Sequence, residues 1–143
     1  MKYIESAKNT NIKQWKKLHT KKERTKTGLF LVEGIHLVEE ALKSGIVKEL
    51  MVTSPDMLPS HIQPDIELYE LSEEAFSAMT ETETPQHIAA VCTVPVFEEK
   101  KVERILLLDA VQDPGNLGTL IRTADAAGLD AVILGEGTVD AFN

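Results

Sequence analysis

Four polar side chains lie around a short turn in the second half of the chain, and their types and spacing suit chemistry on an anion. They are Asp109, Asp113, Asn116 and Arg122. Such a turn binds ligands where the carboxyl end of a strand meets the free N–H groups of a helix, which favour phosphate or carboxylate. A guanidinium grips these groups bidentately, because its donors form a rigid planar fork. The stretch therefore predicts an anion or nucleotide site.

The residues of the chain exclude several other kinds of site. Gly115 and Gly118 do not form the G-x-G-x-x-G fingerprint, and no Gly-Lys-Ser/Thr follows them as in a P-loop. No second carboxylate pair of defined geometry can be inferred, so glycosidase and metal-hydrolase chemistry are unsupported. The four histidines lack metal-ligand spacing, so we assign no metal. The single cysteine, Cys92, cannot form an internal disulfide.

The sequence around the turn predicts the elements that position these side chains. The apolar run 105–108 is typical of a strand buried on both faces, and Asp113-Pro114-Gly115 ends it. From Asn116 the apolar spacing becomes helical, and Gly128 ends the helix. The apolar segment 130–134 predicts a second strand, so we expect a β-α-β unit.

Two alternatives stay open within this helix. Asn116 either caps the helix N-terminus or contacts the substrate side of a site. Arg122, the only arginine from Asp109 onward, either pairs with Asp125 three residues further on or reaches a ligand.

The stretch from Leu106 to Leu134 resembles the first signature motif of the SpoU/TrmH branch of the SPOUT RNA methyltransferases. In that family an Asp-Pro-x-Asn-x-Gly turn precedes a helix that carries an arginine, and Asn116 and Arg122 match those two positions. The resemblance implies RNA ribose 2′-O-methylation with S-adenosylmethionine, and it makes Arg122 and Asn116 the catalytic residues. Because a guanidinium is deprotonated only at great cost, we expect Arg122 to orient the substrate and stabilise the developing alkoxide.

The resemblance also sets an expectation for the extent of the chain, which ends at Asn143. The two later motifs of the family form the knot and most of the S-adenosylmethionine pocket, and they have no counterpart here. We therefore expect an N-terminal fragment without cofactor-binding residues, which binds RNA but does not catalyse alone. For the full-length parent the resemblance implies bound S-adenosylmethionine and a homodimer.

The first 28 residues carry an excess of positive charge. They contain nine basic and two acidic residues, whereas the remainder contains six basic and twenty-one acidic ones, and the net charge of the chain is −8. A basic arm on an acidic body concentrates phosphate binding at one place; the alternative is a solvated helix that binds nothing. The residues that we predict to bind RNA are Lys13, Lys16, Lys17, Lys21, Lys22, Arg24 and Lys26.

An apolar edge predicts how this arm is held. Ile12, Trp15 and Leu18 recur every three residues, so the arm can form a helix that docks this edge while its lysines face solvent. We expect Trp15 to be a docking residue rather than a platform on which bases stack.

Between the arm and the turn, strand patterns alternate with helical ones, which favours a small three-layer α/β domain. The expected strands are 29–32, 49–53, 66–70 and 87–94, and the expected helices are 35–43 and the segment from a Ser72 cap to about Met79.

Two parts of this region resemble the substrate-binding domain of the SpoU/TrmH family, which implies a fold shared with small ribosomal proteins. They are the segment 30–42 and the Pro85-Gln86 pair. Within them we expect Gly34 to admit a tight turn and Glu33 to cap the following helix. His87 replaces the glycine that the resemblance leads us to expect.

The predicted fold class is α/β, with a three-layer substrate-binding domain followed by the first β-α-β unit of an α/β-knot methyltransferase domain. The predicted divisions are 1–28 for the basic arm, 29–95 for the RNA-binding domain, 96–103 for a linker and 104–143 for the start of the methyltransferase domain. No apolar run reaches the length of a membrane span and no signal region opens the chain, so we expect no membrane contact and a cytoplasmic protein.

The sequence therefore predicts an RNA ribose 2′-O-methyltransferase that acts on rRNA. One alternative is a non-catalytic RNA-binding module of ribosomal-protein-like fold, which leaves the residues from Asp113 to Arg122 unexplained. Another is a nucleotide-binding α/β enzyme, against which the missing glycine fingerprints count.

Overall fold

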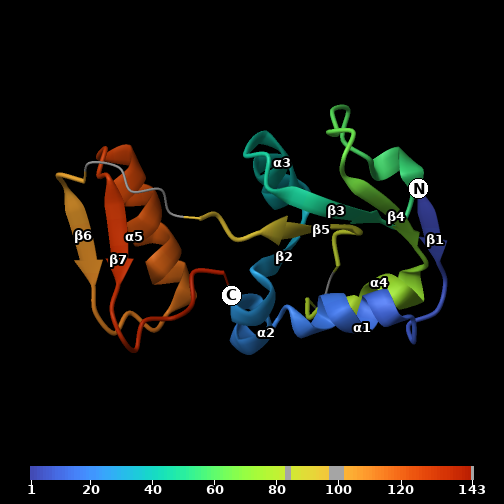
Figure 1. The fold of residues 1–143 in the computed structure, drawn as a ribbon, viewed down its shortest axis with the longest axis horizontal. Helices are drawn as coiled ribbons and strands as arrows, with labels where there is room; N and C mark the ends of the chain where they lie inside the picture. The colour runs from blue at the N-terminus through green and yellow to red at the C-terminus, as the bar shows by residue number, and fades with distance from the viewer. Residues whose placement is uncertain (83–84, 97–101, 143) are drawn as a thin grey trace. The chain divides into compact units, whose positions relative to one another are not determined.

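The chain divides into two compact units, Met1–Pro95 and Val96–Asn143. The computed structural model describes residues 1–82, 85–96 and 102–142, and each unit is described by itself (Figure 1). Residues 97–101 of the predicted linker lie outside the described residues. No helix in the described parts of the chain is long and apolar enough to cross a membrane.

A five-stranded sheet forms the centre of the first unit, with the strand order β1-β4-β3-β5-β2. β1, β4 and β3 run parallel to one another, whereas β5 pairs antiparallel with both β3 and β2. The strands are β1 (Lys2–Ile4), β2 (Leu29–Glu33), β3 (Val47–Val52), β4 (Glu67–Leu71) and β5 (Ile88–Thr93).

Helices cover both faces of this sheet, so the predicted three-layer α/β architecture is confirmed (Figure 1). α1 and α4 pack against one face, α3 packs against the other, and α2 lies beside β2. The helices are α1 (Thr10–Lys17), α2 (Lys21–Thr27), α3 (Ile35–Lys43) and α4 (Glu73–Met79), with a 3-10 turn, η1 (Pro55–Met57), after β3.

The central strands supply apolar side chains to both faces because successive residues of a strand point in opposite directions. In β3, Met51 packs with the side chains of α1 and α4, whereas Leu50 and Val52 pack with those of α3. All three side chains are fully buried. Burial on both faces explains why β5 and the second half of β3, Leu50 to Val52, are almost continuously apolar in the sequence.

The sequence analysis missed β1 and treated residues 1–28 as an arm outside the domain. In the structure these residues belong to the first unit, and Ile4 of β1 pairs with Leu71 of β4. Ser72 ties the two strands at their ends, because its hydroxyl donates to the Glu5 carbonyl at 2.6 Å. The same oxygen accepts from the Ala75 N–H at 3.1 Å, so the predicted Ser72 cap of α4 is confirmed.

The second unit contains the predicted β-α-β arrangement. The parallel strands β6 (Ile105–Leu108) and β7 (Ala131–Leu134) flank α5 (Pro114–Ala126), which buries Leu117 and Ala124. The prediction that the first strand is buried on both faces is wrong for the structure described, since Leu107 is 71% exposed. Ile105 and Ile133 are also exposed, so one face of this parallel pair presents apolar side chains.

Trp15 gives the first prediction, because it is the bulkiest side chain that α1 buries against the sheet. Trp15→Ala should lower the free energy of unfolding by about 3 to 5 kcal/mol, through lost apolar contact and the cavity that remains. Urea unfolding of the purified chain measures this change. The control is Lys16→Ala, an exposed neighbour for which a change within about 0.5 kcal/mol is expected; equal effects of the two substitutions would contradict the docking role.

Candidate functional site

Five of the lysines predicted to bind RNA lie exposed on the neighbouring helices α1 and α2. They are Lys13, Lys16, Lys17, Lys21 and Lys22. Lys26 is also exposed, and its Nζ lies 3.8 Å from Glu23 Oε1, so part of its charge is compensated. These helices therefore present a basic surface, which we define as these six lysines.

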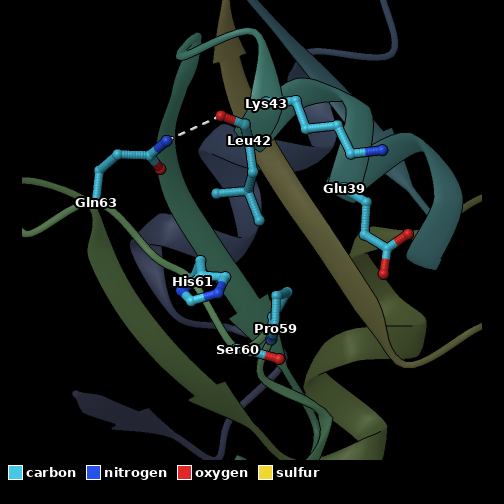
Figure 2. Close-up of a pocket in the computed structure, with 7 residues that line it drawn as sticks. All are labelled: Glu39, Leu42, Lys43, Pro59, Ser60, His61 and Gln63. Atoms are coloured by element: carbon cyan, nitrogen blue, oxygen red, sulfur yellow. Dashed lines mark hydrogen bonds between the residues drawn. The ribbon is translucent and has the colours of Figure 1, made fainter.

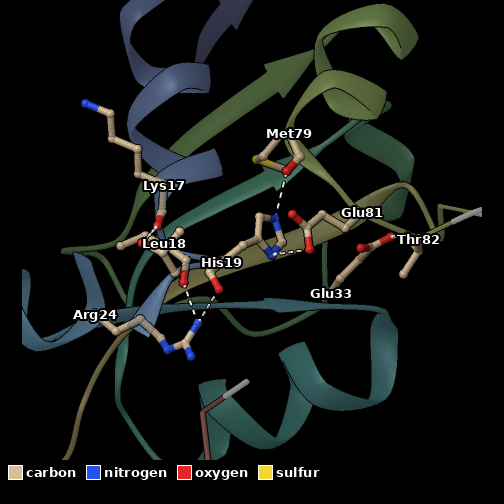
Figure 3. Close-up of polar contacts among 9 residues, drawn as sticks. Lys17, Leu18, His19, Arg24, Glu33, Met79, Glu81 and Thr82 are labelled. Carbon is tan, nitrogen blue, oxygen red and sulfur yellow. Dashed lines mark hydrogen bonds and ion pairs between the residues drawn. The ribbon is translucent and has the colours of Figure 1, made fainter. Parts of the chain in front are cut away.

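Arg24 does not belong to the basic surface, and its prediction as an RNA contact is corrected here. Only 5% of the residue is exposed. Its Nη1 donates to the carbonyls of Leu18 and His19, at 2.9 and 2.8 Å (Figure 3). A buried cation needs such partners, and these carbonyls follow the end of α1. Arg24 therefore fixes the turn between α1 and α2.

Trp15 and His19 attach the basic surface to the rest of the first unit. The Trp15 N–H donates to the Glu49 carboxylate, and the indole meets the Tyr69 ring edge-on with centroids 5.0 Å apart. His19 Nε2 lies 2.9 Å from the Met79 carbonyl and donates to it, since a carbonyl only accepts (Figure 3). The lysines are thus carried on a fixed support, and Trp15 is a docking residue as predicted.

Burial at this contact shifts the titration of Glu49. Desolvation raises the pKa of its carboxyl above the ordinary value, and the hydrogen bond from Trp15 opposes that shift. The half-buried Glu49 carboxylate accepts a hydrogen bond from the indole N–H of Trp15, which would otherwise be buried without a partner.

A second polar contact corrects the role expected for Glu33. Its Oε1 accepts from Thr82 Oγ1 at 2.6 Å (Figure 3). It also accepts from the Gln86 N–H at 3.4 Å, so Glu33 holds the segment after α4 and does not cap α3. Gly34 is the N-cap of α3 with a φ of 98°. A Cβ there would lie 2.6 Å from Gln86 Oε1, so the Gln86 side chain would have to move, and the positive φ strains any residue other than glycine. His87 has a φ of 60°, the left-handed conformation that favours the glycine expected there.

The first unit also has a hollow of about 350 Å³ between α3 and the loop before β4 (Figure 2). Gln63 Nε2 donates to the Leu42 carbonyl at 2.9 Å and closes one side of it. Lys43 is ion-paired with Glu40 at 2.7 Å, which leaves the hollow without an uncompensated cation to attract phosphate. The residues that line it are Glu39, Leu42, Lys43, Pro59, Ser60, His61 and Gln63.

In the second unit, α5 begins at Pro114, two residues earlier than predicted. Asp113 is the N-cap, and its Oδ1 accepts from the Asn116 N–H at 2.6 Å. Pro114 follows at the first helical position, where its missing N–H costs nothing. The alternative in which Asn116 caps the helix is therefore wrong. Asn116 lies in the first turn of α5, so its side-chain amide is not used as the cap.

The loop that leads into α5 is held in a strained conformation. Ala110 has a φ of 53°, which costs a non-glycine residue about 1 to 3 kcal/mol. The segment after β7 supports the loop: the Gly135 N–H donates to the Leu108 carbonyl at 2.7 Å, and the Val139 N–H donates to the Val111 carbonyl at 2.9 Å. This loop and α5 border a hollow of about 480 Å³, lined by Ala110, Val111, Gln112, Asp113, Asn116, Thr119 and Leu120.

Arg122 lies one turn after Thr119 in α5, and its side chain is exposed. Its Nη2 donates to Thr119 Oγ1 at 3.1 Å, and within the described residues no ion pair joins it to Asp125. The pairing left open by the sequence is therefore absent from this part of the chain. Thr119 both lines the hollow and contacts the guanidinium, and the sequence analysis did not single it out. Its position three residues before Arg122 on a predicted helix could have indicated this contact, because residues three apart on a helix are neighbours.

The hollow is thus lined by the Asn116 residue and the N-terminal turn of α5, and one of its lining residues, Thr119, contacts the exposed Arg122 guanidinium. Such an arrangement can hold a phosphate and stabilise negative charge on a neighbouring oxygen. The described residues contain no group of His, Cys, Asp and Glu side chains arranged to hold a metal ion. The arrangement defines a class of site that suits an anionic ligand.

Comparison with known proteins agrees with this class. Residues 9–90 match the model of the MRM3-like substrate binding domain, and residues 103–143 match that of the SpoU rRNA Methylase family. The chain belongs to the SpoU/TrmH family of RNA methyltransferases.

Individual relatives match between 94% and 100% of this chain but are longer. It is 68% identical to the 23S rRNA (guanosine(2553)-2′-O)-methyltransferase RlmP of Bacillus subtilis, over 100% of this chain and 58% of that protein. The AdoMet-bound rRNA methyltransferase of Sinorhizobium meliloti superposes with a TM-score of 0.80 at 34% identity, over 99% of this chain and 57% of that one. AviRb of Streptomyces viridochromogenes, in complex with AdoMet, superposes with a TM-score of 0.78 at 25% identity, over 94% of this chain and 56% of that one. The chain thus spans a little over half the length of these relatives.

The cap of α5 gives the second prediction. Asp113→Ala should destabilise α5 by about 1 kcal/mol, because the first-turn N–H of Asn116 loses its acceptor. Amide hydrogen exchange of α5 in the purified chain measures the change. Asn116→Ala, which leaves the cap intact, is the matched control and should alter exchange by less than about 0.5 kcal/mol. A larger effect of Asn116→Ala than of Asp113→Ala would overturn the assignment of the cap.

Proposed function

We propose that this chain is the RNA-binding and substrate-orienting part of an rRNA ribose 2′-O-methyltransferase that uses S-adenosylmethionine. The observation that carries the proposal is that Asn116 and Thr119 line the hollow at the start of α5 and that Thr119 accepts a hydrogen bond from the Arg122 guanidinium, in a chain of the SpoU/TrmH family. The names of the relatives support rRNA as the substrate and the ribose hydroxyl as the acceptor. The cytoplasmic location and the homodimer are parts of the proposal that rest on the sequence analysis alone.

The roles of the two residues follow from the chemistry of the acceptor. A ribose hydroxyl is a poor nucleophile, so catalysis depends on its position and on stabilising the alkoxide that develops. Arg122 holds the phosphate next to that ribose with its planar fork and lowers the energy of the developing negative charge. Asn116 contacts the substrate from the first turn of α5, where the N–H groups of the helix also favour an anion.

S-adenosylmethionine supplies an electrophilic methyl group on a sulfonium ion. The hollow beside α5 is not lined by an aromatic side chain that could stack on adenine, and its one carboxylate, Asp113, already caps the helix. The described residues around the hollow therefore do not fit the cofactor on their own. We assign this chain to the substrate side of the reaction and derive no step through the cofactor.

The basic surface provides the affinity for RNA in this proposal. Its lysines are exposed on two adjacent helices, whereas the rest of the chain is strongly acidic. Phosphate contacts of this kind release counterions, so the affinity depends steeply on salt concentration.

Charge reversal on α1 gives the third prediction. The double substitution Lys13→Glu with Lys17→Glu should weaken binding of structured RNA about tenfold or more at low salt and reduce the slope of log affinity against log salt by about 2. Filter binding across a salt series measures both. Lys43→Glu with Lys48→Glu makes the same change in net charge outside the basic surface and should have a much smaller effect. Equal losses from the two double variants would show that only net charge matters.

The catalytic role is tested in a chimera, in which this chain replaces the matching 58% of the Bacillus subtilis relative. The fourth prediction is that Arg122→Lys lowers the single-turnover methylation rate of the chimera about a hundredfold or more, because lysine keeps the charge but loses the fork. Labelled methyl transfer to 23S rRNA provides the rate.

Arg104→Lys is the matched control for that measurement. Arg104 Nη2 donates to the Gly128 carbonyl at 2.6 Å, so this arginine holds the end of α5 in place and lies outside the proposed site. Its substitution should leave turnover near normal. Turnover of Arg122→Lys close to that of Arg104→Lys, in chimeras of equal melting temperature, would refute the assigned role.

A further inference from the structure

The position of the Arg122 guanidinium is set by a short chain of hydrogen bonds along α5. Arg122 Nη2 donates to Thr119 Oγ1 at 3.1 Å, and Thr119 Oγ1 donates to the Gly115 carbonyl at 2.9 Å. A hydroxyl has one proton and two lone pairs. Because the proton is committed to the Gly115 carbonyl, a lone pair of the same oxygen is directed to the guanidinium. The direction of hydrogen-bond donation is therefore fixed: it runs from Arg122 through Thr119 to the Gly115 carbonyl in the first turn of α5.

A second observation places the guanidinium back over the preceding turn. A Cβ built at Gly118 would lie 3.4 Å from Arg122 Nη1, in van der Waals contact. Long side chains on a helix lean toward its N-terminus, so this direction is the ordinary one for residue 122. The missing side chain of Gly118 leaves the flank of Nη1 uncovered, while Thr119 holds Nη2.

We propose that Thr119 is a positioning residue, which together with the bare backbone of Gly118 forms a seat for the Arg122 guanidinium. The proposal rests on the proposed function, since it assigns Thr119 a task through Arg122. An exposed arginine samples many rotamers, and each must be given up when it grips a phosphate. The seat holds the fork against Thr119, which itself lines the hollow, before the substrate arrives. One edge of the guanidinium then stays available for the phosphate.

A role of Thr119 in the helix alone would have different consequences. A threonine whose hydroxyl bonds the carbonyl four residues earlier affects the bend and stability of the helix, but not the reaction. The two roles are separated by comparing turnover with stability in variants of nearly equal shape. Valine has the shape of threonine without the oxygen, whereas serine keeps the oxygen.

The fifth prediction is made for the active chimera defined above. Thr119→Val should lower the single-turnover rate about tenfold or more at saturating RNA, because a small misplacement of a catalytic group is costly. Thr119→Ser should restore the rate to within about threefold, since the acceptor returns. Affinity for RNA and the melting temperature should change little in either variant.

Two further variants make the test specific to Arg122. In an Arg122→Lys background, Thr119→Val should cause almost no additional loss, because residues that act through one group are not additive. Gly118→Ala should raise stability, as alanine favours a helix, and yet slow the reaction by covering Nη1. Loss of activity that tracks loss of stability across all these variants would mark Thr119 as structural.

The outcomes also distinguish failure of the seat from failure of the proposed function. An unsubstituted chimera that binds rRNA without methylating it would overturn the proposed function, and with it the inference. A chimera that is active and sensitive to Arg122→Lys, but as fast with Thr119→Val as without it, would overturn the seat alone.

Discussion

The hydrogen bond from the Asn116 N–H to the Asp113 carboxylate determines where α5 begins, and the positions of the functional side chains follow from that starting point. With Asp113 as cap, Asn116 falls in the first turn, Thr119 one turn further, and Arg122 leans back toward both. A start one turn later would leave the Asn116 amide occupied by the backbone. The loop before the cap holds a residue in the left-handed conformation, so the position of the helix is fixed at some cost in energy.

A comparable constraint acts in the first unit, where a basic surface has to be attached to an acidic domain. The attachment uses buried groups that are hydrogen-bonded within the unit: Trp15 donates to Glu49, and Arg24 donates to the carbonyls after α1. Because Trp15 and Arg24 hold the helices, the lysines of α1 and α2 are not needed for the attachment, and they are exposed. The indole and the arginine hold the helices in place, and the lysines face solvent.

The sequence predicted the elements that have strong local signals. The helix at 35–43, the Ser72 cap and the β-α-β arrangement around Arg122 were all found, because apolar periodicity and capping residues are local. β1 was missed because it has three residues, and its partner β4 lies more than sixty residues away in the chain. The burial of Arg24 could not be predicted either, since a cationic side chain in a basic segment gives no local sign of its buried partners.

The family motif proposed Asn116 and Arg122 as site residues but did not give the local geometry. Of the two alternatives left open for Asn116, the helix cap was wrong, and Thr119 was passed over. Both errors concern side-chain partners within one turn of a helix, where several polar residues compete for the same N–H groups and only the folded backbone decides between them. The exposed apolar face of β6 and β7 likewise depends on packing that the local sequence does not specify.

The most direct measurement for the central claim is the chemical identity of the product that the chimera with the Bacillus subtilis relative forms on 23S rRNA. Nuclease digestion followed by mass spectrometry, together with resistance of the modified linkage to alkali, distinguishes a methylated ribose from a methylated base. We expect one ribose 2′-O-methyl nucleotide, formed only when S-adenosylmethionine is present. A base-methylated product, or rRNA that is bound but left unmodified, would contradict the account.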